Sequence, residues 1–152
     1  MKRKDKEVTG AKDIEDIIRR ANICRLALCE GDRPYIVPLC FGYEDGKLYF
    51  HSASQGRKLE LLENNRNVCF EMDIDQELVP GETSCKWGLR YRSVVGFGRA
   101  SFVRDPESKR EALGIIMKNY SEGGLDFSES NVAETTIIKI DVEDMTGKIS
   151  GY

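Results

Sequence analysis

The feature that most constrains the fold is an unbroken alternation of apolar and polar side chains over residues 68–74. Val68, Phe70, Met72 and Ile74 are its apolar members. A period of two puts successive side chains on opposite faces of a β-strand, whereas a helix would scatter the same apolar residues around its axis. The segment therefore predicts a half-buried strand, and with it a chain built on a β-sheet.

Five further segments have the composition or the alternation of strands: residues 25–29, 35–43, 47–52, 90–103 and 135–142. Asp45-Gly46 between two of them is a strong local signal for a hairpin, which makes these two strands antiparallel neighbours. Gly96 and Gly98 interrupt the longest strand and predict a bulge or a bend there.

Three segments have helical spacing instead. Residues 14–21 carry apolar side chains at i, i+3, i+4 and i+7, the stripe of an amphipathic helix. Residues 57–63 have leucines at helical spacing directly after Gly56. Asp105-Pro106 is a strong helix start, because aspartate caps a helix well and proline suits the first helical position.

Two segments, 76–89 and 121–134, have no clean period and are expected to be loops. The remaining pattern predicts a mainly β fold of six mostly antiparallel strands with three flanking helices, as in a small closed or split β-barrel with the helices packed outside. The length of 152 residues, 40% of them hydrophobic, suits one core, so residues 1–152 are expected to form a single domain.

Charge and composition exclude several classes of protein. The net charge of −3 and the pI near 5.4 argue against a nucleic-acid binder. No apolar stretch approaches the length of a membrane span, and the charged start leads into no secretory signal, so a cytoplasmic protein is expected. Five cysteines and one histidine have no zinc-ligand spacing, and four of the cysteines lie in runs where a reduced thiol acts as a small hydrophobe.

The densest cluster of reactive side chains is residues 51–58, which join a strand end to a helix start. It contains His51, two serines, Gly56, Arg57 and Lys58. A helix N-terminus with unpaired N–H groups binds anions, and arginine can grip a phosphate with two hydrogen bonds. The alternative is an ordinary strand–turn–helix corner with solvated charges, and composition leaves both interpretations open.

A second cluster, residues 87–94, places arginines beside Trp87 and Tyr91. These residues could supply a further phosphate contact or stack on a planar ring. The alternative is that the aromatic side chains belong to the core or to a dimer contact. His51 is open in the same way, since a lone histidine at a strand end is either a proton donor or a structural hydrogen-bonding residue.

Four stretches together carry a family resemblance. The stretches are residues 35–39, 49–53, 56–58 and 91–94, the last followed by Gly98. In their order and spacing they resemble the flavin-binding split-barrel family related to pyridoxamine 5′-phosphate oxidase, and more closely its branch of 5-nitroimidazole-resistance-like proteins. The resemblance extends from the first helix to Lys148. It implies a six-stranded antiparallel split barrel that forms a homodimer, with FMN in two equivalent clefts between the subunits.

The resemblance also assigns roles to residues. Ser52, Arg57 and Lys58 would hold the FMN phosphate, helped by the helix start at Gly56. The implied cofactor site as a whole consists of Pro38, Leu39, Cys40, His51, Ser52, Ala53, Gly56, Arg57, Lys58, Trp87, Tyr91, Arg92 and Ser93. Within it, residues 38–40 would line the isoalloxazine, His51 would be the catalytic candidate, and Trp87 and residues 91–93 would complete the cleft from the other subunit.

The function that this resemblance implies is an FMN-dependent oxidoreductase. It would pass electrons from NAD(P)H or a small redox protein to a small acceptor, for which the resemblance suggests a nitroaromatic compound. The alternatives are a flavin carrier or sensor without turnover, and a related barrel that binds haem or another cofactor. The C-terminal signature of true pyridoxamine phosphate oxidases is absent from residues 147–152, which argues against vitamin B6 oxidation.

Overall fold

The computed structural model describes residues 6–121, 123 and 126–152, so the charged start over residues 1–5 lies outside the described residues. The helices and strands follow in the order β1 (Glu7–Val8), α1 (Ala11–Arg20), β2 (Cys24–Glu30), β3 (Arg33–Leu39), β4 (Gly42–Glu44), β5 (Lys47–Ser52), α2 (Arg57–Asn64), β6 (Asn67–Val79), the 3₁₀ turn η2 (Ser84–Lys86), β7 (Gly88–Val103), α3 (Pro106–Lys118), α4 (Glu129–Glu134) and β8 (Thr136–Ser150).

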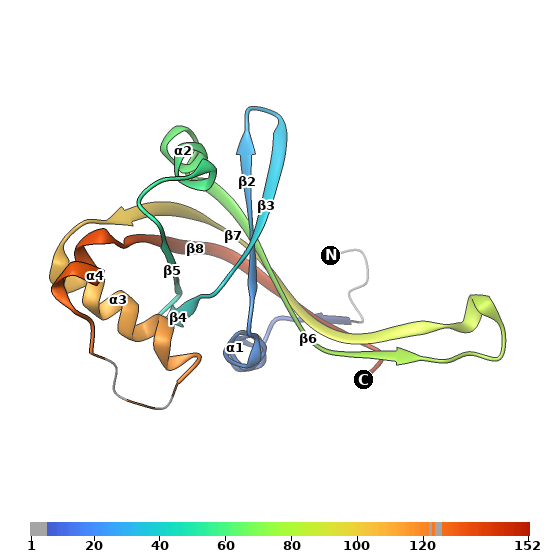
Figure 1. The fold of residues 1–152 in the computed structure, drawn as a ribbon. Coiled ribbons are helices and arrows are strands. Elements are labelled where there is room, and N and C mark those ends of the chain that lie inside the picture. Colours follow the sequence, from blue (N-terminus) through green and yellow to red (C-terminus); the bar gives the residue numbers. More distant parts are fainter. Residues whose placement is uncertain (1–5, 122, 124–125) are drawn as a thin grey trace.

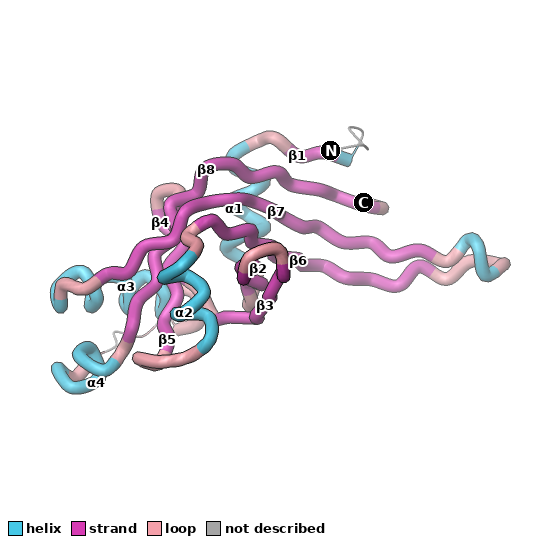
Figure 2. Tube along the Cα trace, turned by 90° about the horizontal axis from the view of Figure 1, so that it is seen from above, coloured by secondary structure: helices cyan, strands magenta, loops and turns pink. Residues whose placement is uncertain are grey.

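The strands form one antiparallel sheet with the order β3-β2-β6-β7-β8-β5-β4, and β1 pairs with β8 (Figures 1 and 2). The sheet curls around a core and is flanked by helices, which confirms the mainly β, split-barrel expectation. The described residues form eight strands where six were expected. One extra strand is β1, and the other arises because the expected strand 35–43 divides into β3 and β4.

This division occurs at Cys40 and Phe41, where the chain passes from one edge of the sheet to the other. Gly42, the first residue of β4, touches the backbone of α3: a Cβ there would lie 2.6 Å from the carbonyl of Ile115. The division thus depends on a helix more than 60 positions away in the sequence, which a local pattern cannot reveal.

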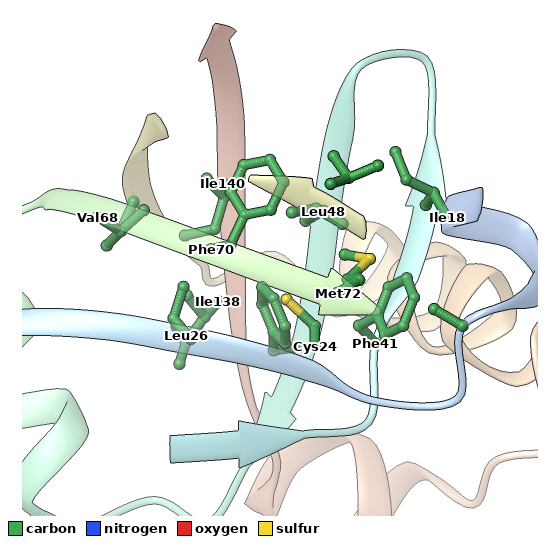
Figure 3. Close-up of a cluster of buried hydrophobic side chains, with 14 of the residues drawn as sticks. Ile18, Cys24, Leu26, Phe41, Leu48, Val68, Phe70, Met72, Ile138 and Ile140 are labelled. Carbon is green, nitrogen blue, oxygen red and sulfur yellow. The ribbon is translucent and has the colours of Figure 1, made fainter. Parts of the chain in front are cut away.

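The core fills the inner side of the sheet. Phe41, Leu48, Phe70, Met72 and Ile138 are completely or almost completely buried, and Figure 3 shows them gathered from segments far apart in the sequence. The apolar stripe of α1 lies within the same core, as its spacing predicted. A smaller cluster packs α3 and α4 against β8.

The expectation of an excursion or loop over residues 76–89 holds for residues 80–87, but residues 76–79 and 88–89 belong to β6 and β7. β6 and β7 continue beyond the rest of the sheet as a two-stranded hairpin arm, defined here as residues 75–90, which projects from the body (Figure 1). The register shifts between Ile74 and Glu77, and Asp75 has a φ of 56°. This bulge breaks the alternation of apolar and polar residues by which a strand is predicted from sequence. Large apolar side chains are exposed on the arm at Leu78, Trp87 and Leu89.

Two further expectations meet different outcomes. Asp105 caps α3 as predicted, since its carboxylate accepts a hydrogen bond of 2.9 Å from the Ser108 N–H. Residues 121–134, expected as a loop, contain the short helix α4, whose Ser128 cap accepts a hydrogen bond from Asn131 and whose Val132 is buried.

The cysteines differ in environment more than their sequence context predicted. Cys24 is buried in the core, where desolvation raises the pKa of its thiol. Cys69 is half-buried, whereas Cys29, Cys40 and Cys85 are exposed, so the expectation of a buried hydrophobic role holds for Cys24 alone. No helix within residues 6–121, 123 and 126–152 is long and apolar enough to cross a bilayer.

We expect Gly96→Ala to destabilise the protein by about 1–3 kcal/mol, the usual cost of overpacking a core. A Cβ at Gly96 would overlap the Phe70 ring and lie 2.8 Å from the Asp144 carbonyl oxygen. The matched control is Gly114→Ala in α3, where the Cβ meets no atom within 4 Å and the better helix former should stabilise by about 0.5–1 kcal/mol. Urea unfolding measures both, and equal effects would contradict this account.

Candidate functional site

The start of α2 is an open helix N-terminus at the end of β5. Gly56 precedes the helix with a φ of 142°, a conformation that suits glycine, and no side chain caps the first turn. The Gly56 carbonyl accepts the N–H groups of Leu59 and Glu60 at 2.9 and 3.3 Å. The N–H groups that come before them in the first turn are available to an anion, and the helix dipole favours negative charge there.

Ser52 is the buried polar group of this region. Only 6% of its surface is exposed, and its hydroxyl has no hydrogen-bond partner among the described residues. An unsatisfied buried hydroxyl costs free energy that a bound ligand can recover. His51 is exposed and precedes Ser52 on the same strand, so their side chains point to opposite faces of β5. His51 and Ser52 were expected in one cluster because they are adjacent in the sequence, but the alternation of the strand puts them on different faces.

Arg57 reaches from α2 to the hairpin of β2 and β3. One guanidinium nitrogen lies 2.8 Å from a carboxylate oxygen of Glu30, and the guanidinium carbon lies 5.0 Å from the centre of the Tyr35 ring. Lys58, next in the sequence, makes no ion pair with any described residue. Seven consecutive residues, 52–58, thus supply two cations, an open helix start and an unpartnered hydroxyl, which is the composition of a phosphate site.

Pro38, Leu39 and Cys40 lie where β3 ends. Pro38 and Cys40 are exposed, whereas Leu39 is half-buried and packs against the core. The Tyr120 hydroxyl anchors the next residue: it accepts the Phe41 N–H at 2.8 Å and donates to the Asn22 carbonyl at 3.0 Å. Partial burial raises the pKa of this hydroxyl.

The second cluster lies far from the first within one chain. Tyr91 pairs with Ser150 on β8, whereas Val103 and His51 both pair with Ile137. Val103 therefore marks the height of His51 on the sheet, and twelve residues of β7 separate it from Tyr91. At 3.3 Å per residue this is roughly 40 Å of extended strand. A single chain does not bring residues 87–93 together with residues 51–58.

Alternation also divides the second cluster. Tyr91 and Ser93 share one face of β7, and the Lys148 ammonium donates a hydrogen bond to the Tyr91 hydroxyl. Arg92 points to the other face, where it lies 3.5 Å from Asp75 and under the Tyr152 ring. Trp87 stands on the hairpin arm and is about half exposed. The sequence did not predict a contact between Lys148 and Tyr91, because only the pairing of β7 with β8 brings them together.

The outward side of β3, β2, β6 and β7 carries an apolar row. Cross-strand pairing aligns Ile36 with Ala27, Ala27 with Cys69, and Cys69 with Phe97, so these four side chains lie side by side on one face. Ile36 is 59% exposed and Phe97 is 53% exposed. We call this row, together with its flanking residues Pro38 and Val95, the outer face. Two large exposed apolar side chains, joined across four strands by two smaller half-buried ones, suit a contact surface.

Comparison with known proteins places this arrangement in a family. The sequence profile of the family described as pyridoxamine 5′-phosphate oxidase matches residues 10–149, nearly the whole chain. The chain belongs to this family. Within it, a candidate 5-nitroimidazole antibiotic resistance protein from Bacteroides thetaiotaomicron is 35% identical over 94% of this chain and 86% of that one, with a TM-score of 0.85. The chain therefore belongs to the 5-nitroimidazole-resistance-like branch, as the sequence indicated.

Two further solved structures share the fold. An FAD-binding protein from Mesorhizobium loti is 25% identical over 93% of this chain and 96% of that chain, with a TM-score of 0.70. An FAD- and haem-binding protein from Mycobacterium smegmatis has a TM-score of 0.87, covers 97% of this chain and 74% of that chain, and is 19% identical, a similarity of fold. An uncharacterised protein of Rhizobium meliloti is 28% identical over 65 residues, which span 43% of this chain and 42% of that protein.

Proposed function

We propose that this chain is an FMN-binding flavoprotein that acts as an oxidoreductase and reduces a small acceptor, with a nitroaromatic compound as the favoured class. The observation that carries the proposal is the buried, unpartnered Ser52 hydroxyl, four residues before the uncapped start of α2 at Gly56. Membership of the pyridoxamine 5′-phosphate oxidase family supports a flavin as the ligand, and so do the relatives named as FAD-binding.

The residues present fit the phosphate end of FMN. The phosphate would accept hydrogen bonds from the first N–H groups of α2, from Ser52 and from the side chains of Arg57 and Lys58. Hydrogen bonds to a charged group are worth roughly 1.5–3 kcal/mol each, so this end would carry much of the affinity. Gly56 keeps the approach open, because it has no side chain at the helix start.

The ring end would lie along the exposed termini of β3 and β5. Pro38, Leu39 and Cys40 would contact the isoalloxazine from one edge, and His51 and Ala53 from the other. When bound, FMN supplies two-electron redox chemistry, and the protein supplies binding, orientation and electrostatics. In this proposal His51 donates a proton or a hydrogen bond to the reduced flavin or to the acceptor during turnover, and NAD(P)H or a small redox protein is the electron source.

A homodimer would complete the cleft. The outer face gives each subunit an apolar surface suited to a two-fold contact, and the hairpin arm carries further exposed apolar side chains. Since residues 87–93 lie about twelve strand residues from His51 in their own chain, their contribution to a flavin site requires a second copy. Trp87, Tyr91, Arg92 and Ser93 would then cover the flavin bound to the partner.

A flavin carrier or sensor without turnover is the competing function. The exposure of His51, which makes no side-chain hydrogen bond to a described residue, suits either role. The same binding site serves both functions, so the difference between them lies in turnover and not in affinity.

Replacing Arg57 and Lys58 together with alanine should lower FMN affinity at least a hundredfold, because two charge-assisted contacts to the phosphate are lost. Riboflavin, which lacks the phosphate, should bind almost unchanged. Flavin fluorescence quenching by the apoprotein measures both affinities. The control is the double variant Lys12→Ala/Arg19→Ala on α1, which removes the same charge elsewhere. Equal weakening of FMN and riboflavin would show that Arg57 and Lys58 serve the fold alone.

Light scattering at low micromolar concentration should report twice the chain mass of 17.2 kDa. Phe97→Asp and Ile36→Asp should each shift the protein to monomer and weaken FMN binding, because a buried unpaired carboxylate is costly at an apolar contact. Ile23→Asp, at another exposed isoleucine that lies outside the outer face, is the control. A wild-type monomer that binds FMN tightly would eliminate the shared cleft.

His51→Ala should lower nitroimidazole reduction by NADH at least a hundredfold per bound FMN and leave FMN affinity within about threefold, as expected for a general acid. Tyr49→Phe, on the same face of β5, is the matched control. Turnover is normalised to the flavin content of each preparation. Unchanged turnover per bound FMN in the alanine variant would assign His51 a structural role, and absence of turnover in the wild type would favour the carrier.

A further inference from the structure

The ion pair between Arg57 and Glu30 puts a negative charge inside the candidate phosphate site. Glu30 ends β2, and its carboxylate oxygen lies 2.8 Å from the guanidinium of Arg57, the same group that would bind the phosphate. Both side chains are about half exposed, so the pair itself contributes little to stability. The pair matters because the Glu30 carboxylate would repel a phosphate that binds the same guanidinium.

We propose that Glu30 competes with the cofactor phosphate for Arg57, and that it thereby sets how strongly the site discriminates among flavins by the charge on their phosphate. This inference rests on the proposed flavin phosphate site. A phosphate monoester carries close to two negative charges near neutral pH, whereas the nearest phosphate of a dinucleotide such as FAD carries one. Repulsion by one fixed carboxylate therefore grows from riboflavin to FAD to FMN.

The surroundings of the pair suit such competition. The Glu30–Arg57 contact is a single one that engages one guanidinium nitrogen, so the planar group keeps other donors for a phosphate. The Tyr35 ring lies 5.0 Å from the guanidinium carbon, a cation–π contact that favours this position of the arginine with either anion. A phosphate therefore meets an arginine already in position, with a carboxylate beside it.

Glu30 also has a second cation within reach. It pairs in register with Arg33 across the Gly31–Asp32 turn, so the two side chains lie on the same face of the hairpin. Arg33 is exposed and forms no ion pair with any residue the structure describes. A phosphate that takes over Arg57 can thus release Glu30 toward Arg33 without leaving the carboxylate unpaired.

Glu30 has two opposing effects on FMN affinity, and the larger of them decides whether binding is strengthened or weakened. Glu30 helps to order an exposed arginine, which is a small gain because Tyr35 already restrains it. Against this stands the repulsion between the Glu30 carboxylate, whether it lies beside Arg57 or Arg33, and a doubly charged phosphate on Arg57, which is worth roughly tenfold in affinity near a protein surface. Repulsion dominates, so Glu30 weakens FMN binding and makes the cofactor easier to exchange.

The test measures binding of FMN, FAD and riboflavin to the apoprotein for the wild type and Glu30→Gln. The variant should bind FMN roughly tenfold more tightly, FAD roughly threefold more tightly, and riboflavin within twofold of the wild type. The gain for FMN should shrink as ionic strength rises, because salt screens the repulsion. Asp32→Asn removes the same charge two residues away without touching Arg57, and should leave all three affinities within about twofold.

The outcomes separate this inference from the function on which it rests. If Arg57→Ala selectively lowers FMN affinity while Glu30→Gln leaves it equal or weaker, the phosphate site stands and the role of Glu30 is overturned. If Glu30→Gln still gains tenfold in an Arg57→Ala background, competition for Arg57 is wrong. If Arg57→Ala has the same affinity as the wild type for FMN, and likewise for riboflavin, the phosphate site fails and the inference fails with it. Glu30→Ala, checked for an unchanged unfolding midpoint, repeats the test with a second side chain.

Discussion

The alternation of side chains along β5 and β7 decides which groups can act together. It turns the Ser52 hydroxyl inward and leaves His51 on the opposite face. It also puts Tyr91 and Ser93 on one face of β7 and Arg92 on the other. A shift of one residue in either strand would exchange these faces, so the pairing of β5 and β7 with β8 is the constraint from which the site follows.

The same pairing explains why Trp87 and residues 91–93 could join the proposed site only from a second copy. The long ladder between β7 and β8 holds Tyr91 at one end of the sheet and the α2 start at the other. An apolar row on the outer face and a hairpin arm that projects from the body give a second copy two surfaces to engage (Figure 1). In the proposed dimer, residues 87–93 of one subunit would reach residues 51–58 of the other, although the two clusters lie far apart within one chain.

Local patterns predicted the elements that depend on local causes. The alternation over residues 68–74, the Asp45-Gly46 turn and the Asp105 cap all appear as expected, because each is fixed by a few neighbouring residues. The division of β3 from β4 was missed, since it depends on contact between Gly42 and α3. The hairpin arm was missed because a bulge at Asp75 breaks its period.

The candidate site was predictable to a similar degree. The cluster over residues 51–58 could be found from its residue types and from family resemblance. The ion pair of Arg57 with Glu30 could not, because it joins residues 27 positions apart through the geometry of the β2–β3 hairpin. The Lys148–Tyr91 hydrogen bond, across 57 positions, escaped for the same reason.

The central claim is that the open start of α2 and the faces around it form a flavin site. The absorption spectrum of the purified protein, followed by mass analysis of the released chromophore, tests it most directly. This account predicts the visible and near-ultraviolet bands of oxidised flavin and release of FMN in a ratio of one per chain. A Soret band without flavin bands, or a colourless protein that takes up no added FMN, would contradict it.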